Sequence, residues 1–350
     1  MVKTVVVDFS YLGILCGFGN IAEHYSRRLA ESLTDDLHFV FIVPERYLGA
    51  YGPHIDYLRR EHLRADADAY PQQIDLWHAT SQAFTYRRHV RGTQQLLTIH
   101  DLNFLYEKKH IHRLKHLLRM QYMVARSDAV TVISNYVKTD LERHVTLWGK
   151  PVEVIYNGVN VPDATHTCRP NFITDDEPFF MALGQVLEKK NFQRLVPMMR
   201  HFPDHRLYIC GDTQFPYAQT LRDIIQREHA DNCIVAGLIS EAEKTWMYQH
   251  CRAFLMASQS EGFGLPVVEA MQMGRPVVLA RATSLPEIGS RYAHYWDRLD
   301  NARQMADVVR HCMSAATPQL LADEQQYALS FSYERYMQSY LQLYRRLLNL

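Results

Sequence analysis

The sequence has no C-x-x-C pair, because its six cysteines lie far apart along the chain. This spacing argues against a zinc knuckle, a thioredoxin-like motif and a disulfide framework, and it fits a reducing cytosol best. No basic stretch followed by a long apolar one marks an export signal at the N-terminus. No apolar run reaches the roughly 18 residues that a membrane-spanning helix requires. We therefore expect a cytoplasmic protein that reaches a membrane only from its surface.

An excess of either charge is also absent, since 38 Lys and Arg residues balance 38 Asp and Glu residues. Nothing in the overall charge attracts nucleic acid. Hydrophobic residues, by contrast, make up 47% of the 350 positions, which is enough for sizeable cores and excludes a disordered chain. At about 150 residues per domain, this length predicts two domains.

Short β-branched runs alternate with helical stretches through both halves of the chain. Such continuous apolar strands are typical of a parallel sheet covered on both faces. The stretch 161–178 has three prolines and no periodicity, which is typical of a linker. We predict an α/β fold of two doubly wound, Rossmann-like domains facing an interdomain cleft, where ligands of such sheets bind. The expected strands are 3–9, 38–43, 75–79, 95–100, 129–134, 152–157, 179–184, 205–211, 233–238, 253–258 and 276–280.

The most informative segment is 258–274, SQSEGFGLPVVEAMQMG. A strand, a glycine loop and a helix follow one another here, with Pro266 near the start of the helix and Gly274 at its end. Glycines let the backbone approach a ligand closely, and the N–H groups of a first helical turn suit a phosphate. Taken singly, Glu261 and Glu269 would be solvated surface acids. Together they favour a nucleotide sugar, whose vicinal hydroxyls carboxylates can bind.

The segment 261–269, EGFGLPVVE, resembles the Glu-x7-Glu motif of the retaining GT-B glycosyltransferases, the glycosyl transferases group 1. It is similar in particular to bacterial polysaccharide and O-antigen mannosyltransferases. Further matching motifs follow in the family's order over nearly the whole chain, at 17–20, 98–104, 130–141, 154–160, 184–192 and 284–289.

This resemblance implies a role for each site residue. Glu269 would bind the ribose hydroxyls, Glu261 would lie beside the donor sugar ring, and Lys190 would contact the diphosphate and offset the charge of the leaving group. Without the flanking match, Lys190 would be an exposed lysine at a helix start. Many relatives carry an arginine where this chain has Gln185, so the chain departs from their two-cation pattern. The other implied donor-binding residues are Gly17, Gly19, Gly184, Asn191, Gly262, Phe263, Gly264 and Leu265.

The glycines of 16–22, CGFGNIA, also fit the dinucleotide fingerprint G-x-G-x-x-A, so an NAD-dependent dehydrogenase has to be weighed. The context is poor, because seven residues lie between the expected strand and Gly17, and Glu45 is farther away than the usual spacing of about 20 residues. In the resembling family, this glycine loop closes over the donor phosphate. A titration with a nicotinamide cofactor would discriminate the two interpretations.

His100 and Asp101 follow the strand 95–100, at the edge where ligands are expected. A single histidine is more often structural than catalytic. The resemblance places this one near the donor sugar, where it could hydrogen-bond a sugar hydroxyl or steady the departing oxygen. Asp101 is a secondary candidate, since it could equally cap the next segment.

The stretch 107–126 is rich in bases and leucines. It could be a basic amphipathic helix lying on an anionic membrane, or an ordinary solvated helix packed by its leucines. The candidate membrane-surface residues are Lys108, Lys109, Arg113, Lys115 and Arg119.

These observations predict a retaining glycosyltransferase that moves a hexose onto a hydroxyl of a glycan or lipid-linked glycan in surface polysaccharide (lipopolysaccharide) biosynthesis. GDP-mannose is the leading donor and a UDP-sugar the alternative. By resemblance, 1–165 with the C-terminal helix 331–350 would bind the acceptor, and 166–330 the donor. We expect no cofactor and no metal, because the motifs quoted above contain no D-x-D pair. A silent sugar-nucleotide-binding partner is the alternative from another class.

The resemblance also favours a front-face displacement aided by the leaving phosphate, since no enzyme nucleophile is apparent. The expected location is the cytoplasm, with peripheral contact at the inner face of the cytoplasmic membrane.

Overall fold

The computed structural model describes the whole chain except residues 1, 15–16, 33, 64–72, 84–91 and 108–109. It divides into two compact units. Unit 1 comprises Met1–Gly158 and Phe331–Leu350, and unit 2 comprises Val159–Ser330. The sequence placed the boundary between 165 and 166.

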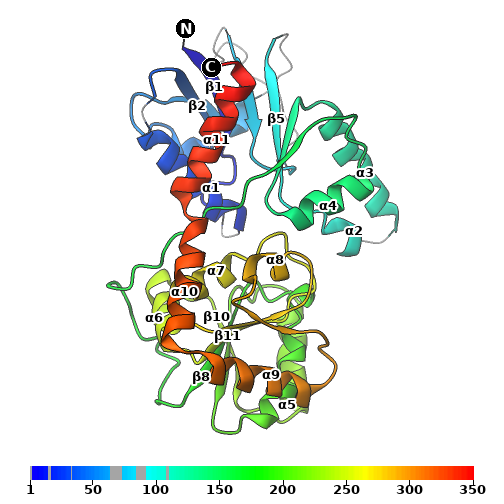
Figure 1. Cartoon of the computed structure of the whole chain (residues 1–350), viewed down its shortest axis with the longest axis vertical. Coiled ribbons are helices and arrows are strands. Elements are labelled where there is room, and N and C mark those ends of the chain that lie inside the picture. Colours follow the sequence, from blue (N-terminus) through cyan, green and yellow to red (C-terminus); the bar gives the residue numbers. More distant parts are fainter. Residues whose placement is uncertain (1, 15–16, 33, 64–72, 84–91, 108–109) are drawn as a thin grey trace. The chain divides into compact units, whose positions relative to one another are not determined.

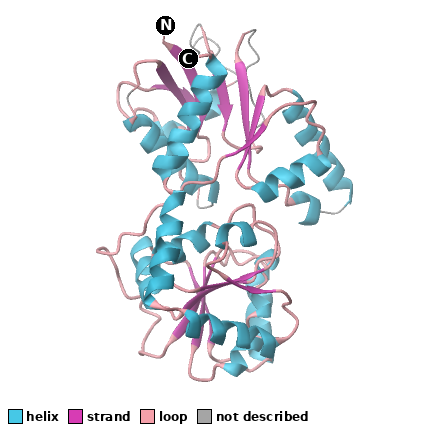
Figure 2. Cartoon of the chain, viewed as in Figure 1, coloured by secondary structure: helices cyan, strands magenta, loops and turns pink. Residues whose placement is uncertain are grey.

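Unit 1 contains a seven-stranded parallel sheet in the order β3-β2-β1-β4-β5-β6-β7 (Figures 1 and 2). Its helices include α1 (Gly17–Glu31), α2 (Phe104–Glu107), α3 (His110–Ala125), α4 (Asn135–His144) and α11 (Tyr333–Leu348). The strands are β1 (Lys3–Asp8), β2 (Leu37–Val43), β3 (Asp56–Arg59), β4 (Leu76–Ala79), β5 (Gln94–Ile99), β6 (Ala129–Val132) and β7 (Val152–Val154).

Both faces of this sheet are covered, which explains the continuous apolar strands. Successive side chains of a strand point to opposite faces. Val5 and Val7 accordingly join the core beneath α1 and α11, whereas Val6 packs with Trp77 on the other face. Figure 1 shows α11 running beside α1, although the two helices are some 300 residues apart in the sequence.

Unit 2 contains a six-stranded parallel sheet in the order β10-β9-β8-β11-β12-β13. Its strands are β8 (Phe179–Leu183), β9 (Arg206–Cys210), β10 (Cys233–Gly237), β11 (Ala253–Met256), β12 (Val277–Ala280) and β13 (His294–Trp296). Its α-helices are α5 (Tyr217–Arg227), α6 (Glu241–His250), α7 (Leu265–Gln272), α8 (Leu285–Gly289), α9 (Ala302–Ala315) and α10 (Pro318–Ala328). The prediction of two doubly wound, Rossmann-like domains is confirmed.

Two short edge elements escaped the sequence analysis, β3 and β13. Each carries charged or half-exposed residues and lacks the apolar run that marks a central strand. The predicted linker 161–178 packs onto unit 2: the Cys168 N–H donates to the Ala242 carbonyl at 3.2 Å, and the Arg169 guanidinium lies over the Trp246 ring.

The strand order fixes where each sheet can bind a ligand. In unit 1 the chain leaves β1 toward β2 and returns to β4 on the other side of β1, so β1 and β4 flank a topological switch point. In unit 2 the corresponding pair is β8 and β11. Ligands of open α/β sheets bind at the carboxyl ends of such strand pairs. The loops after β1, β4, β8 and β11 are therefore where candidate residues should be sought.

Candidate active site

The loop after β8 brings Lys190 to the switch point of unit 2. It begins at Gly184, whose φ of 152° favours glycine, and a Cβ there would lie 3.2 Å from Cε of Lys190. Glycine at this position therefore leaves room for the lysine side chain. A short 3-10 turn, Glu188–Lys190, ends at buried Asn191, whose left-handed conformation reverses the chain directly after Lys190.

Lys190 forms an ion pair with Glu261, which follows β11. The distance between Nζ of Lys190 and Oε1 of Glu261 is 2.6 Å, and both side chains are largely buried. The two loops are also joined through the backbone, because the Gln259 N–H donates to the Lys189 carbonyl at 2.8 Å. The structure thus brings together two of the three residues predicted to be catalytic.

The loop after β12 supports the backbone around Glu261. The Glu261 N–H donates to Oγ1 of Thr283 at 3.0 Å. The buried hydroxyl of Ser284 donates to the carbonyls of Glu261 and Phe263, at 3.0 and 3.1 Å. These contacts hold the glycine loop on both sides of Gly262, so the position of Glu261 is fixed by tertiary contacts.

Helix α7 starts directly after this loop. Its N-cap, Gly264, has a φ of 101°, and a Cβ there would come within 3.1 Å of Leu285. Gly264 has no side chain that could cap the first turn, which contains Leu265 and Pro266. The helix ends in a Schellman motif at Gly274, with Arg275 N–H donating to the Ala270 carbonyl at 3.0 Å. The predicted strand, glycine loop and helix are all present.

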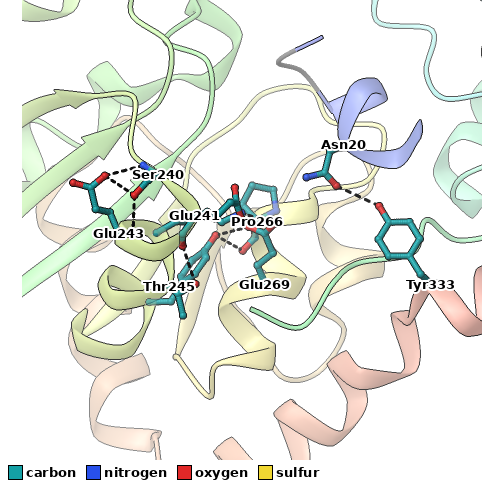
Figure 3. A network of polar contacts seen from close by, with 10 residues as sticks. Asn20, Ser240, Glu241, Glu243, Thr245, Pro266, Glu269 and Tyr333 are labelled. Atoms are coloured by element: carbon teal, nitrogen blue, oxygen red, sulfur yellow. Dashed lines mark hydrogen bonds and ion pairs between the residues drawn. The ribbon is translucent and has the colours of Figure 1, made fainter. Parts of the chain in front are cut away.

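Glu269 projects from α7 toward α6, where Lys244 and Tyr248 hold its carboxylate. Nζ of Lys244 lies 3.1 Å from Oε1, and the Tyr248 hydroxyl donates to Oε2 at 2.9 Å. Figure 3 shows Glu269 in this network, together with the Ser240–Glu243 capping box that starts α6. Each carboxylate oxygen keeps a further acceptor position, so the group can still accept hydrogen bonds from two hydroxyls.

The charges of this network are stabilised by one another. Burial alone lowers the pKa of Lys244, but the carboxylates of Glu269 and exposed Glu241 outweigh it and hold that pKa above its ordinary value. Burial and the nearby Glu269 carboxylate raise the pKa of Tyr248 well above its usual range. Lys244 is therefore an ammonium and Tyr248 a neutral donor at neutral pH, so both can donate hydrogen bonds to Glu269.

In unit 1, His100 lies at the carboxyl end of β5, next to the switch point. Its Nε2 is 2.8 Å from the carbonyl of Thr80, the residue after β4, and its ring contacts the edge of Phe18. Burial lowers the pKa of His100 to about 4, so the ring is neutral at pH 7. Because a carbonyl can only accept, Nε2 carries the proton and Nδ1 is an acceptor. In this tautomer Nδ1 can accept a hydrogen bond from a sugar hydroxyl, but it cannot donate one to a departing oxygen.

Gly17, Gly19 and Asp101 of unit 1 lie in or next to helices. Gly17 and Gly19 lie in the first turn of α1 and not in a loop, and a Cβ on Gly19 would come within 1.9 Å of the Ile14 carbonyl. Oδ1 of Asp101 accepts the Asn103 N–H at 3.0 Å, so Asp101 does cap the segment that precedes α2.

Helix α3 turns an apolar stripe outward. Ile111, Leu114, Leu118 and Tyr122 are each more than half exposed, and their spacing places them on one face. The helix packs inward instead through Met120, Met123 and Val124. The interpretation of a helix packed by its leucines is therefore wrong for Leu114 and Leu118.

The bases near this stripe differ in their surroundings. Arg113 and Lys115 are exposed, whereas Arg119 donates to the Ala83 carbonyl at 2.6 Å. Lys108 and Lys109 lie outside the described residues. Among the helices of the described ranges, none combines the length and the apolar character needed to cross a bilayer.

Comparison with known proteins identifies the family of this chain. Residues 166–314 match the family described as Glycosyl transferases group 1, and residues 21–162 match Glycosyltransferase Family 4. The chain belongs to the GT-B glycosyltransferases. One family model thus matches unit 1 and the other matches unit 2.

Curated relatives of this GT-B chain include the O-antigen chain mannosyltransferase RfbU of Salmonella typhimurium. It is 26% identical over 205 residues, which cover 57% of this chain and 56% of that protein. The chain therefore matches only about half the length of this relative. The O-antigen chain mannosyltransferase B of Escherichia coli is 44% identical over 52 residues, 15% of this chain and 14% of that protein.

Solved structures share the fold over nearly the full length of this GT-B chain. Sucrose-phosphate synthase from Thermosynechococcus elongatus has a TM-score of 0.76 at 17% identity, covering 99% of both chains. Anabaena HepE, in complex with UDP and glucose, has a TM-score of 0.74 at 15% identity, covering 98% of this chain and 100% of that one.

Four residues of the site were missed from the sequence: Lys244, Tyr248, Thr283 and Ser284. Lys244 and Tyr248 are spaced four apart, which places them on one face of a helix, and this was the available signal. Their partner Glu269 lies on a different helix. A local sequence pattern does not predict a contact between two helices.

Proposed function

We propose that this chain is a retaining glycosyltransferase that transfers a hexose, with mannose from GDP-mannose as the leading donor, to a hydroxyl of a glycan or lipid-linked acceptor in surface polysaccharide biosynthesis. The observation that carries the proposal is the pair of buried ion pairs at one sheet edge, Lys190 with Glu261 and Lys244 with Glu269. One pair would serve the reacting centre and the other the nucleoside.

The charges suit the parts of a nucleoside diphosphate sugar. Lys190 would exchange its contact with Glu261 for the donor diphosphate and offset charge on the leaving group. Glu261, released from that pair, would lie beside the sugar ring, where positive charge develops as the bond to phosphate lengthens. Glu269 would accept hydrogen bonds from the two ribose hydroxyls, and the neutral His100 ring would accept one from a sugar hydroxyl.

The names of the relatives support two donors. The O-antigen mannosyltransferases favour GDP-mannose, whereas HepE holds UDP-glucose and so keeps a UDP-sugar as the alternative. Donor hydrolysis should be measured across GDP- and UDP-sugars, with Glu261→Gln as the impaired reference and exposed Glu188→Gln as the matched control. Turnover of GDP-mannose alone would support the leading donor. No donor turnover, together with tight binding of one nucleotide, would favour a silent binding partner.

Retention of configuration needs its own measurement. The anomeric signal of the first product formed should be followed by NMR with the donor that the screen identifies. An α-linked product from an α-linked donor supports retention. A β-linked product would overturn it.

We also propose that the donor diphosphate is held without a metal ion. Lys190 and the uncapped N-terminus of α7 supply the positive potential that a divalent cation would otherwise provide. Turnover should then be unchanged by EDTA. Loss of transfer in EDTA and its recovery with manganese or magnesium would contradict this proposal.

We propose further that the apolar stripe of α3 docks on an anionic membrane. Outward-facing Ile111, Leu114, Leu118 and Tyr122 are joined by nearby bases, each of which contributes about 1 kcal/mol at an anionic surface. Exposed Trp148 follows two residues after Thr146, whose backbone bonds to Gln121 of α3. Insertion of the apolar side chains and attraction of the bases would act together.

Flotation with anionic liposomes at low salt tests this surface. The double variant Leu114→Ser, Leu118→Ser should float less, as should the Lys108, Lys109, Arg113 and Lys115 quadruple alanine variant. Leu238→Ser, at an exposed leucine of unit 2, is the matched control and should float like the unaltered protein. Equal flotation of all four proteins would reject the surface.

A further inference from the structure

A pocket lies at the opposite edge of the unit 2 sheet from the candidate active site. It has a volume of about 440 Å³, and its lining includes residues that immediately precede β8, β11 and β12. Strands of four or five residues, at about 3.3 Å per residue, separate it from the switch-point loops. It is therefore a different place from the proposed donor site, and its size is within the range of about 300–1,000 Å³ of small-molecule sites.

Two arginines and a histidine supply the polar lining of this pocket, and none of its lining residues is an acid. Arg252 is exposed, and within the described part of the chain neither its guanidinium nor that of Arg275 takes part in an ion pair. Arg206 on the neighbouring strand gives the contrast, because Asp175 and Glu177 both pair with it at 2.8 Å. At this edge of the sheet, two carboxylates thus balance the charge of Arg206, whereas none pairs with Arg252 or Arg275 in the described part of the chain.

One of the two pocket arginines, Arg275, is held by backbone carbonyls. Nε and Nη1 of Arg275 approach the carbonyls of Met273 and Cys251 at 3.4 and 3.5 Å, which leaves Nη2 for another partner. His205 stacks on the Phe180 ring, 5.0 Å between centroids. Burial and then the charge of Arg252 lower the pKa of His205, against the opposing charge of Asp204, so the ring adds hydrogen bonding and no charge at pH 7.

The rest of the lining is apolar. It includes Met313 of α9, Leu321 of α10, Ala316, Cys251 and two prolines. A guanidinium binds phosphate or carboxylate through two parallel hydrogen bonds. A ligand that satisfies the whole lining thus carries both an oxyanion and a small apolar group.

We infer that this pocket, the arginine pocket, is a second ligand site that binds a small molecule bearing a phosphate or carboxylate next to an apolar group, through Arg252 and Arg275. This inference does not depend on the proposed function. Phosphate and carboxylate share the chemistry that the guanidinium groups recognise, and the probes below separate them.

Binding to the full chain should be measured by calorimetry with phenyl phosphate, benzoate, inorganic phosphate and benzyl alcohol. We expect phenyl phosphate or benzoate to bind, inorganic phosphate to bind more weakly, and benzyl alcohol not to bind. The stronger of the first two identifies the oxyanion. The absence of saturable binding of both below about 10 mM would overturn the inference.

Variants locate the binding. Arg252→Ala, at an exposed position that should not disturb folding, should weaken binding roughly 10-fold or more, because a charge-assisted hydrogen bond is lost. Arg222→Ala, at an exposed arginine of α5, is the matched control and should bind like the unaltered protein. Equal affinity of the Arg252 and Arg222 variants would overturn the assignment.

Two further measurements separate this pocket from the proposed donor site. Lys190→Ala should leave phenyl phosphate binding unchanged, whereas loss of binding in that variant would place the anion at the donor site and overturn the inference. The NMR signal of the His205 ring, assigned with His205→Gln, should shift on titration. An unshifted His205 signal during saturable binding would also overturn it.

Discussion

At the switch point of unit 2, ammonium groups from Lys190 and Lys244 meet carboxylates across neighbouring loops and helices. At the switch point of unit 1, the neutral ring of His100 lies against Phe18 and a backbone carbonyl. Both sheets are parallel, and in both the order of strand addition reverses beside the first strand, β1 or β8. The same topology therefore carries an ionic site in one unit and a neutral, aromatic one in the other.

The interior of unit 1 continues this difference. Beneath α11, His78 lies between the hydroxyls of Tyr344 and Thr98, at 2.6 and 2.8 Å, and stacks on the Tyr340 ring. Tyr344 also shares a hydrogen bond of 2.8 Å with Tyr25 of α1. At the N-terminal turn of α11, Tyr333 donates to Asn20 (Figure 3). The buried face of α11 is thus joined to unit 1 by neutral hydrogen bonds, whereas the last turn of the helix is joined to it by the ion pairs of Arg345 with Asp36 and of Arg346 with Glu153.

The largest effect is expected from a substitution at Glu261, which removes one carboxylate of the ionic site. Glu261→Gln should lower kcat roughly 10- to 1000-fold, which corresponds to about 1.4 to 4 kcal/mol lost from the transition state beside the sugar ring. Steady-state kinetics on the variant, with circular dichroism to confirm folding, measures this. Glu188→Gln is the control, and an unchanged kcat for Glu261→Gln would contradict the proposed role.

A smaller effect is expected at the second ion pair of unit 2. Glu269→Gln should chiefly raise the donor KM, roughly 10-fold, because hydrogen bonds to ribose hydroxyls are present equally in ground and transition states. Tyr248→Phe should raise KM in the same direction by a few-fold, since it frees Oε2 to rotate. Glu241→Gln removes only the exposed partner of Lys244 and is the control. A fall in kcat at constant KM for Glu269→Gln would reverse the assignment of the two glutamates.

The neutral His100 ring of unit 1 should make the free energy of unfolding depend on pH. With a pKa of about 4 when folded and about 6.5 when unfolded, His100 contributes stability that is complete above pH 6.5 and is lost as the pH falls toward 4. Lowering the pH from 7 to 5 should therefore cost about 2 kcal/mol through this group. Urea unfolding at both pH values should give a smaller difference for His100→Gln. Equal differences for the two proteins would show that His100 is accessible to protons.

The smallest expected effect concerns the hydrogen bonds beneath α11. Tyr344→Phe leaves Nδ1 of His78 and the Tyr25 hydroxyl short of a partner, which should lower the free energy of unfolding by about 1 kcal/mol. Tyr122→Phe, at an exposed tyrosine of α3, should change it little. Chemical denaturation compares the two. Identical midpoints would mean that packing and the ion pairs of Arg345 and Arg346 hold the helix without a contribution from this hydroxyl.

The sequence predicted eleven of the strands that the structure describes because each is a short apolar run, and hydrophobic periodicity is a local property. It missed β3 and β13, two edge strands in which charged or half-exposed residues replace the apolar run. It placed Glu261, Gly264 and the helix after them correctly, since turn and cap residues act over a few positions. It also treated 161–178 as a linker, because polar composition alone does not reveal packing against unit 2.

What the sequence by itself determined was the order of strands and helices, the glycine loop after β11 and the family of the chain. The tertiary structure alone decided which side chains meet: Lys190 with Glu261 across 71 positions, and Lys244 and Tyr248 with Glu269 across 25 and 21. It alone turned the leucines of α3 outward and buried His100 deeply enough to keep it neutral. The physical reason is that periodicity and capping act between near neighbours, whereas ion pairing, burial and the resulting pKa depend on which distant segments the sheet order brings together.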